Sequence, residues 1–175
     1  MDAATIEAAR RGDRRAQARL LGALQDVWYR FCLSQLRDAD KAADATQETA
    51  LRFLKHLPDF RGDSQLQTWS LGIALNVVRE TRRKRNPDAL DSENAPEVAV
   101  TQRVTGELED RESKQMLRQT LDTLPDRQRE ALVLRFFEEM SVEQTAAAMN
   151  CAVGTVKATV HQALRALRQK MSQSL

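Results

Sequence analysis

A dense group of cations closes the first half of the chain. The run RETRRKR holds Arg79, Arg82, Arg83, Lys84 and Arg85. Cations at the end of a helix complement its dipole, which gives the run a structural interpretation. So many cations exceed what one helix end needs, however, because a dipole carries only about half a charge at each end. The run therefore also predicts a contact with the phosphates of a nucleic acid.

A second group of polar residues lies near the C-terminus, in SVEQTAAAMNCAVGTVKATVHQALRALRQKM. Its spacing predicts a short helix, a tight turn and a longer helix, the dimensions of a helix-turn-helix. Apolar residues of the longer helix form one stripe, and six others are expected to face outward: Thr155, Lys157, Ala158, Thr159, His161 and Gln162. Such a face can read base edges in the major groove. A plain helical hairpin with a solvated face is the alternative.

No spacing in the sequence indicates catalysis. Paired carboxylates, His–Cys pairs and Gly-rich phosphate loops are missing, and Cys32 and Cys151 match no metal or redox spacing. We therefore expect no enzyme activity, no metal and no cofactor. Two isolated cysteines, with no secretory segment and no apolar run that could span a bilayer, favour a cytoplasmic protein that does not insert into a membrane.

The composition predicts an all-α fold that positions these residues. The 175 residues include only 6 Gly and 4 Pro, 5% are aromatic, and the good helix formers dominate. Helices are expected at about 2–11, from Asp13 onward, at about 41–57, and after Ser64. Ser64 and Gln67 have capping-box spacing, as do Ser141 and Gln144. Pro125 is expected at the first position of its helix, and Asn150 at the end of another.

The composition changes between residues 86 and 112. This segment has two prolines, few large apolar residues and an acidic excess, which is typical of a linker. We therefore expect two small helical domains, 1–85 and 113–175, joined by a flexible acidic linker at 86–112. The C-terminal domain contains the helix-turn-helix.

Two features of the N-terminal domain allow more than one interpretation. Asp44, Gln47 and Glu48 lie on the polar side of a predicted helix, which is usually a solvated face with i,i+4 pairing. In the loop DFRGDSQLQTW, Phe60 is either a hydrophobic anchor folded under the loop or a ring held out for a ligand.

Together these segments resemble the extracytoplasmic-function (ECF) sigma factors of bacterial RNA polymerase, in the sigma-70 family. DATQETALRFLKHLPDFRGDSQLQTW and IALNVVRETRRKR resemble the family's promoter-melting and minus-ten domain. LPDRQREALVLRFFEEMSVEQTAAAMNCAVGTVKATVHQALRALR resembles its minus-thirty-five domain. The joint occurrence of QET, FRGD, TW, LP, QRE and GTVK at the family's spacing makes the resemblance specific.

The resemblance implies a function for each group of residues. Asp44, Gln47 and Glu48 match positions that dock on core RNA polymerase. Phe60 and Asn76 match positions that hold a flipped-out minus-ten base, with Arg61 and the RETRRKR cations on the nearby backbone. The outward residues of the last helix match the face that reads the minus-thirty-five element, although Ala158, Thr159 and Gln162 stand where family members often carry Ser, Arg and Arg.

The expected partners are core RNA polymerase, promoter DNA and an anti-sigma factor. The chain would direct promoter recognition, DNA melting and transcription initiation without catalysing a reaction. One alternative is a helix-turn-helix regulator that binds duplex DNA without polymerase, which would not need this N-terminal domain. Another is a helical adaptor that binds no DNA, against which the cation cluster and the last helix argue.

Overall fold

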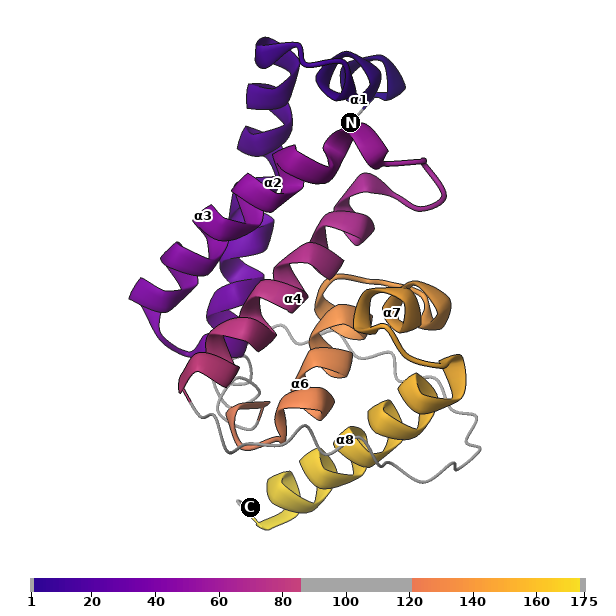
Figure 1. The fold of residues 1–175 in the computed structure, drawn as a ribbon. Helices are drawn as coiled ribbons and strands as arrows, with labels where there is room; N and C mark the ends of the chain where they lie inside the picture. The colour runs from indigo at the N-terminus through magenta and orange to yellow at the C-terminus, as the bar shows by residue number, and fades with distance from the viewer. Residues whose placement is uncertain (1, 86–120, 174–175) are drawn as a thin grey trace. The chain divides into compact units, whose positions relative to one another are not determined.

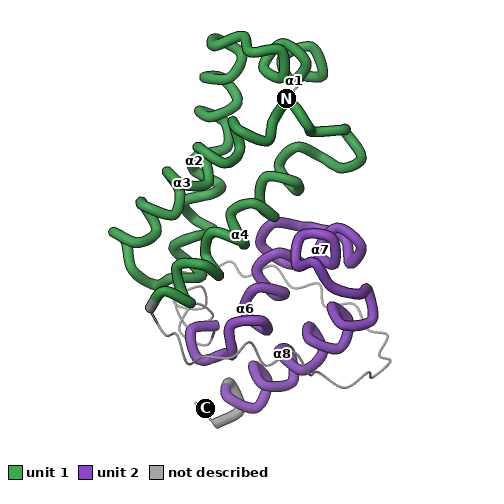
Figure 2. The backbone as a smooth tube through the Cα atoms, viewed as in Figure 1, with its two compact units in different colours: residues 1–91 green, residues 92–175 purple. Residues whose placement is uncertain are grey.

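The computed structural model describes residues 2–85 and 121–173 (Figure 1). In these residues the secondary structure is helical and no strand is found, so the prediction of an all-α fold is confirmed. The chain divides into two compact units, Met1–Asp91 and Ser92–Leu175, called unit 1 and unit 2 below (Figure 2). The segment 86–112, predicted as a linker, lies outside the described residues.

Within residues 2–85, unit 1 has four α-helices and one 3-10 turn. Their bounds are α1 (Ala3–Arg10), α2 (Arg14–Leu36), α3 (Ala39–His56), η1 (Leu57–Asp59) and α4 (Leu66–Arg85). An aspartate precedes each of the first three helices, and its carboxylate accepts a hydrogen bond from a backbone N–H of the first turn. These caps satisfy donors that the helix itself leaves without partners. Gly12 separates α1 from α2 with a φ of 94°, a value that suits glycine.

Aromatic rings form the centre of unit 1. The ring centroids of Trp28 and Phe53 are 5.2 Å apart, and those of Phe53 and Trp69 are 5.7 Å apart. Trp28 and Phe53 have no exposed surface. The indole Nε1–H of Trp28 donates to the Ser70 Oγ at 2.9 Å, so the polar end of this buried ring has a partner. These contacts join α2, α3 and α4 into one core.

The turn between α3 and α4 differs from the expectation. Pro58 lies in η1, directly after α3, because it has no N–H with which to continue the helix. The next helix, α4, begins at Leu66. Ser64 therefore is not the residue before the first helical position, and the predicted capping box with Gln67 is wrong. Gln65 occupies that position instead, and its carbonyl accepts from the N–H of Trp69 at 3.0 Å. Side-chain spacing alone could not distinguish the two starts.

Unit 2 contains the predicted helix-turn-helix. Its described elements are α6 (Asp126–Leu132), a π-helical turn η2 (Val133–Phe137), α7 (Val142–Met149) and α8 (Val153–Gln173). Both hydrogen bonds of the Ser141–Gln144 capping box are present, and Asn150 ends α7 in the left-handed conformation, as predicted. Pro125 is the cap before α6 rather than its first residue, because its extended ψ of 148° keeps it outside the helix.

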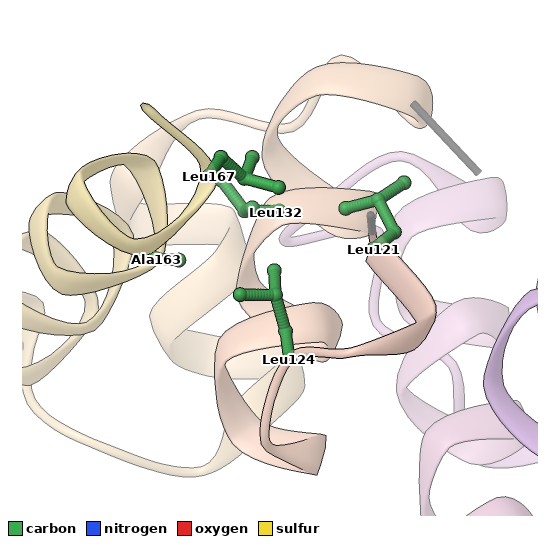
Figure 3. Packing of buried hydrophobic residues seen from close by; sticks show 5 residues of the cluster. All are labelled: Leu121, Leu124, Leu132, Ala163 and Leu167. Atoms are coloured by element: carbon green, nitrogen blue, oxygen red, sulfur yellow. The ribbon is translucent and has the colours of Figure 1, made fainter. Parts of the chain in front are cut away.

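One hydrophobic cluster in the core of unit 2 joins residues that precede α6 to residues of α6 and α8. Figure 3 shows five members of this cluster: Leu121, Leu124, Leu132, Ala163 and Leu167. The last two lie four residues apart on α8, so they face the same side of that helix. This packing fixes which side of α8 remains for other contacts. None of the described helices is both long and apolar enough to cross a membrane.

Candidate nucleic-acid interface

One face of α4 carries an aromatic ring, an amide and cations in a row. Asn76 follows Trp69 by seven residues, which is about two helical turns, so both lie on the same side about 10 Å apart. Arg79 and Arg83 follow on this side at spacings of three and four residues. Asn76, Arg83 and Lys84 are exposed, and Arg79 is half-buried. Amide and guanidinium groups in this order suit bases and backbone phosphates of a single strand.

Arg82 belongs to the same run but projects elsewhere. Its Nη2 donates to the backbone oxygen of Gln35 at 3.1 Å and to the Gln35 Oε1 at 2.9 Å. Gln35 is buried at the end of α2, where backbone carbonyls lack partners within the helix. Arg82 therefore ties α4 to α2. Arg85 closes α4, and its side chain is outside the description.

Phe60 lies under the turn that leads to α4. Its ring centroid is 5.0 Å from that of Trp69, with an angle of 43° between the planes, and only 7% of Phe60 is exposed. The next three residues, including Arg61 and Gly62, are exposed. Of the two interpretations of Phe60, this geometry corresponds to the hydrophobic anchor.

The polar side of α3 presents the three residues expected to contact a partner. Asp44 and Gln47 are exposed, and the Glu48 side chain is 45% exposed. Leu51 stands beside them with 65% of its surface exposed, and no sequence motif pointed to it. Leu51 follows Gln47 by four residues and Glu48 by three, so it shares their face. This face therefore combines acidic, amide and apolar groups.

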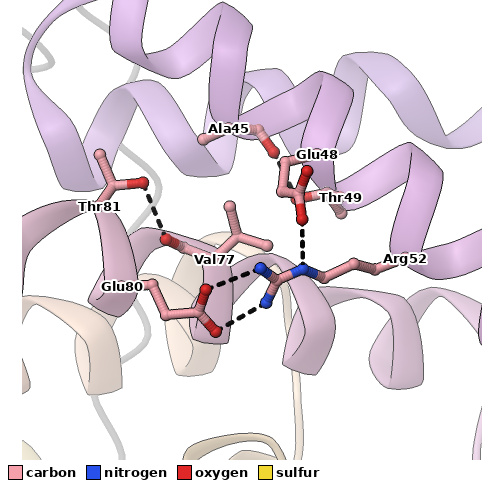
Figure 4. Close-up of polar contacts among 7 residues, drawn as sticks. All are labelled: Ala45, Glu48, Thr49, Arg52, Val77, Glu80 and Thr81. Atoms are coloured by element: carbon pink, nitrogen blue, oxygen red, sulfur yellow. Dashed lines mark hydrogen bonds and ion pairs between the residues drawn. The ribbon is translucent and has the colours of Figure 1, made fainter. Parts of the chain in front are cut away.

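An ion-pair network joins this face to α4. The Arg52 Nε donates to the Glu48 Oε1 at 2.6 Å, and its two terminal nitrogens donate to the two carboxylate oxygens of Glu80, each at 2.7 Å (Figure 4). These hydrogen bonds hold the pKa of Glu80 below its usual value, with smaller contributions from Arg83 and Lys84. Pairing of Glu48 with Arg52 follows from their i,i+4 spacing, but Glu80 comes 28 residues later and no local pattern could find it.

The longer helix of the helix-turn-helix presents four of the six expected residues at its surface. Lys157 is exposed, and Thr155, His161 and Gln162 are half-buried. Ala158 and Thr159 are 1% and 5% exposed, so the expectation that they face outward is wrong for this structure. Thr159 lies at the edge of the buried stripe, four residues before Ala163. The side chain of Ala158 is a single methyl group that stays close to the backbone. Helical periodicity does not predict whether neighbouring residues cover so short a side chain.

Two arginines of unit 2 make contacts that the sequence did not predict. Arg129 is 1% exposed, donates from Nη1 to the Leu124 carbonyl at 3.1 Å and pairs with Asp126. Its guanidinium thus fixes the turn before α6. In η2, the Arg135 guanidinium lies 5.8 Å from the ring centroid of the exposed Phe136. π-Helical turns within helices often accompany function, and this one precedes the helix-turn-helix.

The two cysteines lie in different surroundings. Cys32 is fully buried in unit 1, and burial raises the pKa of its thiol to about 11. A thiol that is not ionised near neutral pH is a poor nucleophile and a poor metal ligand. Cys151 is half-buried in the turn after α7. Cys32 therefore acts as an apolar packing residue in unit 1.

Comparison with known proteins decides the family. Residues 20–87 match the family model "Sigma-70 region 2", and residues 114–167 match "Sigma-70, region 4". The chain is 34% identical to the RNA polymerase sigma-H factor of Pseudomonas aeruginosa over 95% of this chain and 91% of that protein. It is 30% identical to the ECF RNA polymerase sigma factor SigW of Bacillus subtilis, over 95% and 94% of the two chains. The chain belongs to the ECF sigma factors of the sigma-70 family.

The solved structures agree with this assignment. The sigma factor RpoE of Bartonella quintana, crystallised with the anti-sigma factor NepR, is 28% identical with a TM-score of 0.68, over 89% of this chain and 96% of that one. CnrH in complex with the cytosolic domain of CnrY is 21% identical with a TM-score of 0.72, over 98% and 97%, and shows the fold alone. The ECF sigma factor described here is therefore a subunit that binds core RNA polymerase and directs promoter recognition, melting and initiation.

Proposed function

We propose that this ECF sigma factor divides its tasks between two domains. Residues 1–85 bind core polymerase and the minus-ten element, residues 113–175 bind the minus-thirty-five element, and residues 86–112 connect them. The division is supported by the separate region 2 and region 4 matches, which lie on either side of residues 88–113. The chain acts in the cytoplasm and catalyses no reaction itself.

The α3 face is the proposed polymerase-binding surface. The observation that carries it is that Asp44, Gln47 and Glu48 project from one side of α3, with the apolar Leu51 beside them. An apolar group within a polar rim is the usual composition of a protein–protein contact. We assign the surface to a cationic site on core polymerase, because its exposed charged groups are carboxylates.

The row along α4 is the proposed minus-ten site. Asn76 can hydrogen-bond the edge of a flipped-out base, and Arg61, Arg79, Arg83, Lys84 and Arg85 can neutralise phosphates. Arg82 contributes through its contact with Gln35, which holds this end of α4 in place. Phe60 can stack on the base only after the atoms that cover its ring move, because 7% exposure leaves no free ring face.

The N-terminal half of α8 is the proposed minus-thirty-five site. Lys157 supplies a cation for phosphate, and His161, Gln162 and Thr155 supply hydrogen-bonding groups for base edges. Ala158 and Thr159 would contribute to recognition only if they become accessible in the promoter complex.

An anti-sigma factor is the proposed regulator. RpoE of Bartonella quintana was solved with the anti-sigma factor NepR, and CnrH was solved with the cytosolic domain of CnrY. This chain shares their fold. A partner that covers the α3 face would block polymerase directly.

Transcription with core polymerase tests the proposal as a whole. Run-off transcription on fragmented genomic DNA, with the products sequenced, should give initiation at a small set of related promoters. The variant Asp44→Arg with Glu48→Arg should abolish holoenzyme assembly, because two like charges would face a cationic site. Normal assembly of this folded variant would show that the polymerase-binding surface lies elsewhere.

A further inference from the structure

The geometry of Arg52 suggests that it does more than join two helices. It stands between two carboxylates, and the guanidinium makes a two-point contact with Glu80 on α4 but a single contact with Glu48 on its own helix (Figure 4). Two-point contacts between guanidinium and carboxylate are both stronger and more directional than single ones. Glu80 therefore determines where the guanidinium fork points.

The two threonines beside the network do not compete for these groups. Thr49 donates to the Ala45 carbonyl at 2.7 Å, and Thr81 donates to the Val77 carbonyl at 2.9 Å, each within its own helix. Thr49 is fully buried, whereas the Arg52 side chain is 32% exposed. Arg52 thus lies at the edge where the packed side of α3 meets its polar side.

The balance of charge leaves Glu48 available to a partner. Two carboxylates against one guanidinium leave one net negative charge in the network. Because Glu80 occupies the fork, Glu48 uses only Oε1 for Arg52, and its side chain remains 45% exposed. In the absence of Glu80, the fork could turn onto both oxygens of Glu48, since i,i+4 residues lie within reach of each other.

We propose that Glu80 is a positioning residue for the polymerase-binding surface: by holding Arg52 in a two-point contact, it leaves one carboxylate oxygen of Glu48 free for core polymerase. This rests on the proposed function of the α3 face. It also means that a residue among the DNA-binding cations of α4 sets the strength of a protein contact made by another helix.

A binding cycle with intact core polymerase and the full chain tests the proposal. Glu80→Gln should weaken core binding about three- to fivefold, the range expected for a partly exposed charge contact. The matched control is Glu7→Gln, which removes a carboxylate of similar exposure from the Glu7–Arg10 pair on α1 and should leave core affinity unchanged. In a Glu48→Gln background, Glu80→Gln should have no further effect, because its target is already gone.

A purely structural contribution of Glu80 predicts a different result. Its loss would then reduce core affinity by the same factor whether or not Glu48 is present, and this outcome, or wild-type affinity in Glu80→Gln, overturns the proposal. Arg52→Lys is the second variant, since lysine keeps the charge but lacks the planar fork. Combined with Glu80→Gln, it should restore core binding, because no fork remains to turn onto both oxygens of Glu48. Core affinity that stays as low as in Glu80→Gln alone would also contradict the inference. Unchanged binding in Glu48→Gln would instead refute the placement of the polymerase-binding surface.

Discussion

The ring of Phe60 packs on that of Trp69, which in turn packs on Phe53, so the turn before α4 is anchored to the core of unit 1. Asn76 lies two turns further along α4, on the same side as Trp69. The proposed base-binding residues are thus supported by the same rings that stabilise the unit. A ring that is 7% exposed must be uncovered before it can stack on a base.

Removing this ring should impair promoter melting more than duplex binding. Phe60→Ala deletes a buried ring and should also cost about 3–5 kcal/mol of stability, so Phe60→Leu is the better variant because it keeps an apolar contact with Trp69. We expect Phe60→Leu holoenzyme to bind duplex promoter normally and to melt it more slowly, as measured by permanganate reactivity of unpaired thymines. An equal loss of duplex binding and melting would exclude a base-capture role.

Substitution on α8 should separate affinity from sequence preference. Lys157→Ala should weaken binding to all promoters alike, because a phosphate contact carries no sequence information. Gln162→Ala should change the preference at one base position by about 1–3 kcal/mol. A minus-thirty-five promoter library transcribed by each holoenzyme measures both effects. An unchanged preference profile for Gln162→Ala would remove this residue from the reading face.

The buried guanidinium of Arg129 should be critical for unit 2. Arg129→Ala leaves the Leu124 carbonyl without this donor, and an unsatisfied buried acceptor costs about 1–3 kcal/mol. Hydrogen exchange of amides in residues 121–173 should accelerate, while amides of α2 and α3 should keep their protection. Arg127→Ala, a half-buried arginine two residues earlier, is the control and should alter exchange little. Similar protection in both variants would show that Arg129 is not required.

The Arg52–Glu80 contact should stabilise unit 1 only above the acid range. The pKa of Glu80 is lower in the folded protein than its ordinary value of 4.5, so its stabilising contribution is fully present above 4.5 and is lost as the pH falls through the folded value. The free energies of unfolding of the wild type and of Glu80→Gln, measured in urea, should therefore differ near neutral pH and become equal in acid. If the difference in unfolding free energy stays constant down to about pH 2.5, ionisation of a group other than Glu80 is responsible for it.

The sequence by itself determined the helices, the family and most of the candidate residues. Local signals were sufficient for these: Asp13 and Ser141 cap their helices, Asn150 ends α7, and QET, FRGD and GTVK occur at the family's spacing. Helical periodicity also placed Asp44, Gln47 and Glu48 together on one side of α3. Such features depend on residues within a few positions of each other, which is why a single chain reveals them.

Only the tertiary structure decided how these residues are engaged. It showed that Arg82 of the cation run contacts Gln35, that Phe60 is covered, and that Ala158 and Thr159 are buried. It also brought Glu80 to Arg52 from 28 residues away. Burial and long-range pairing depend on which helices pack together. The spacing of side chains within one helix does not predict which of them the neighbouring helices will cover.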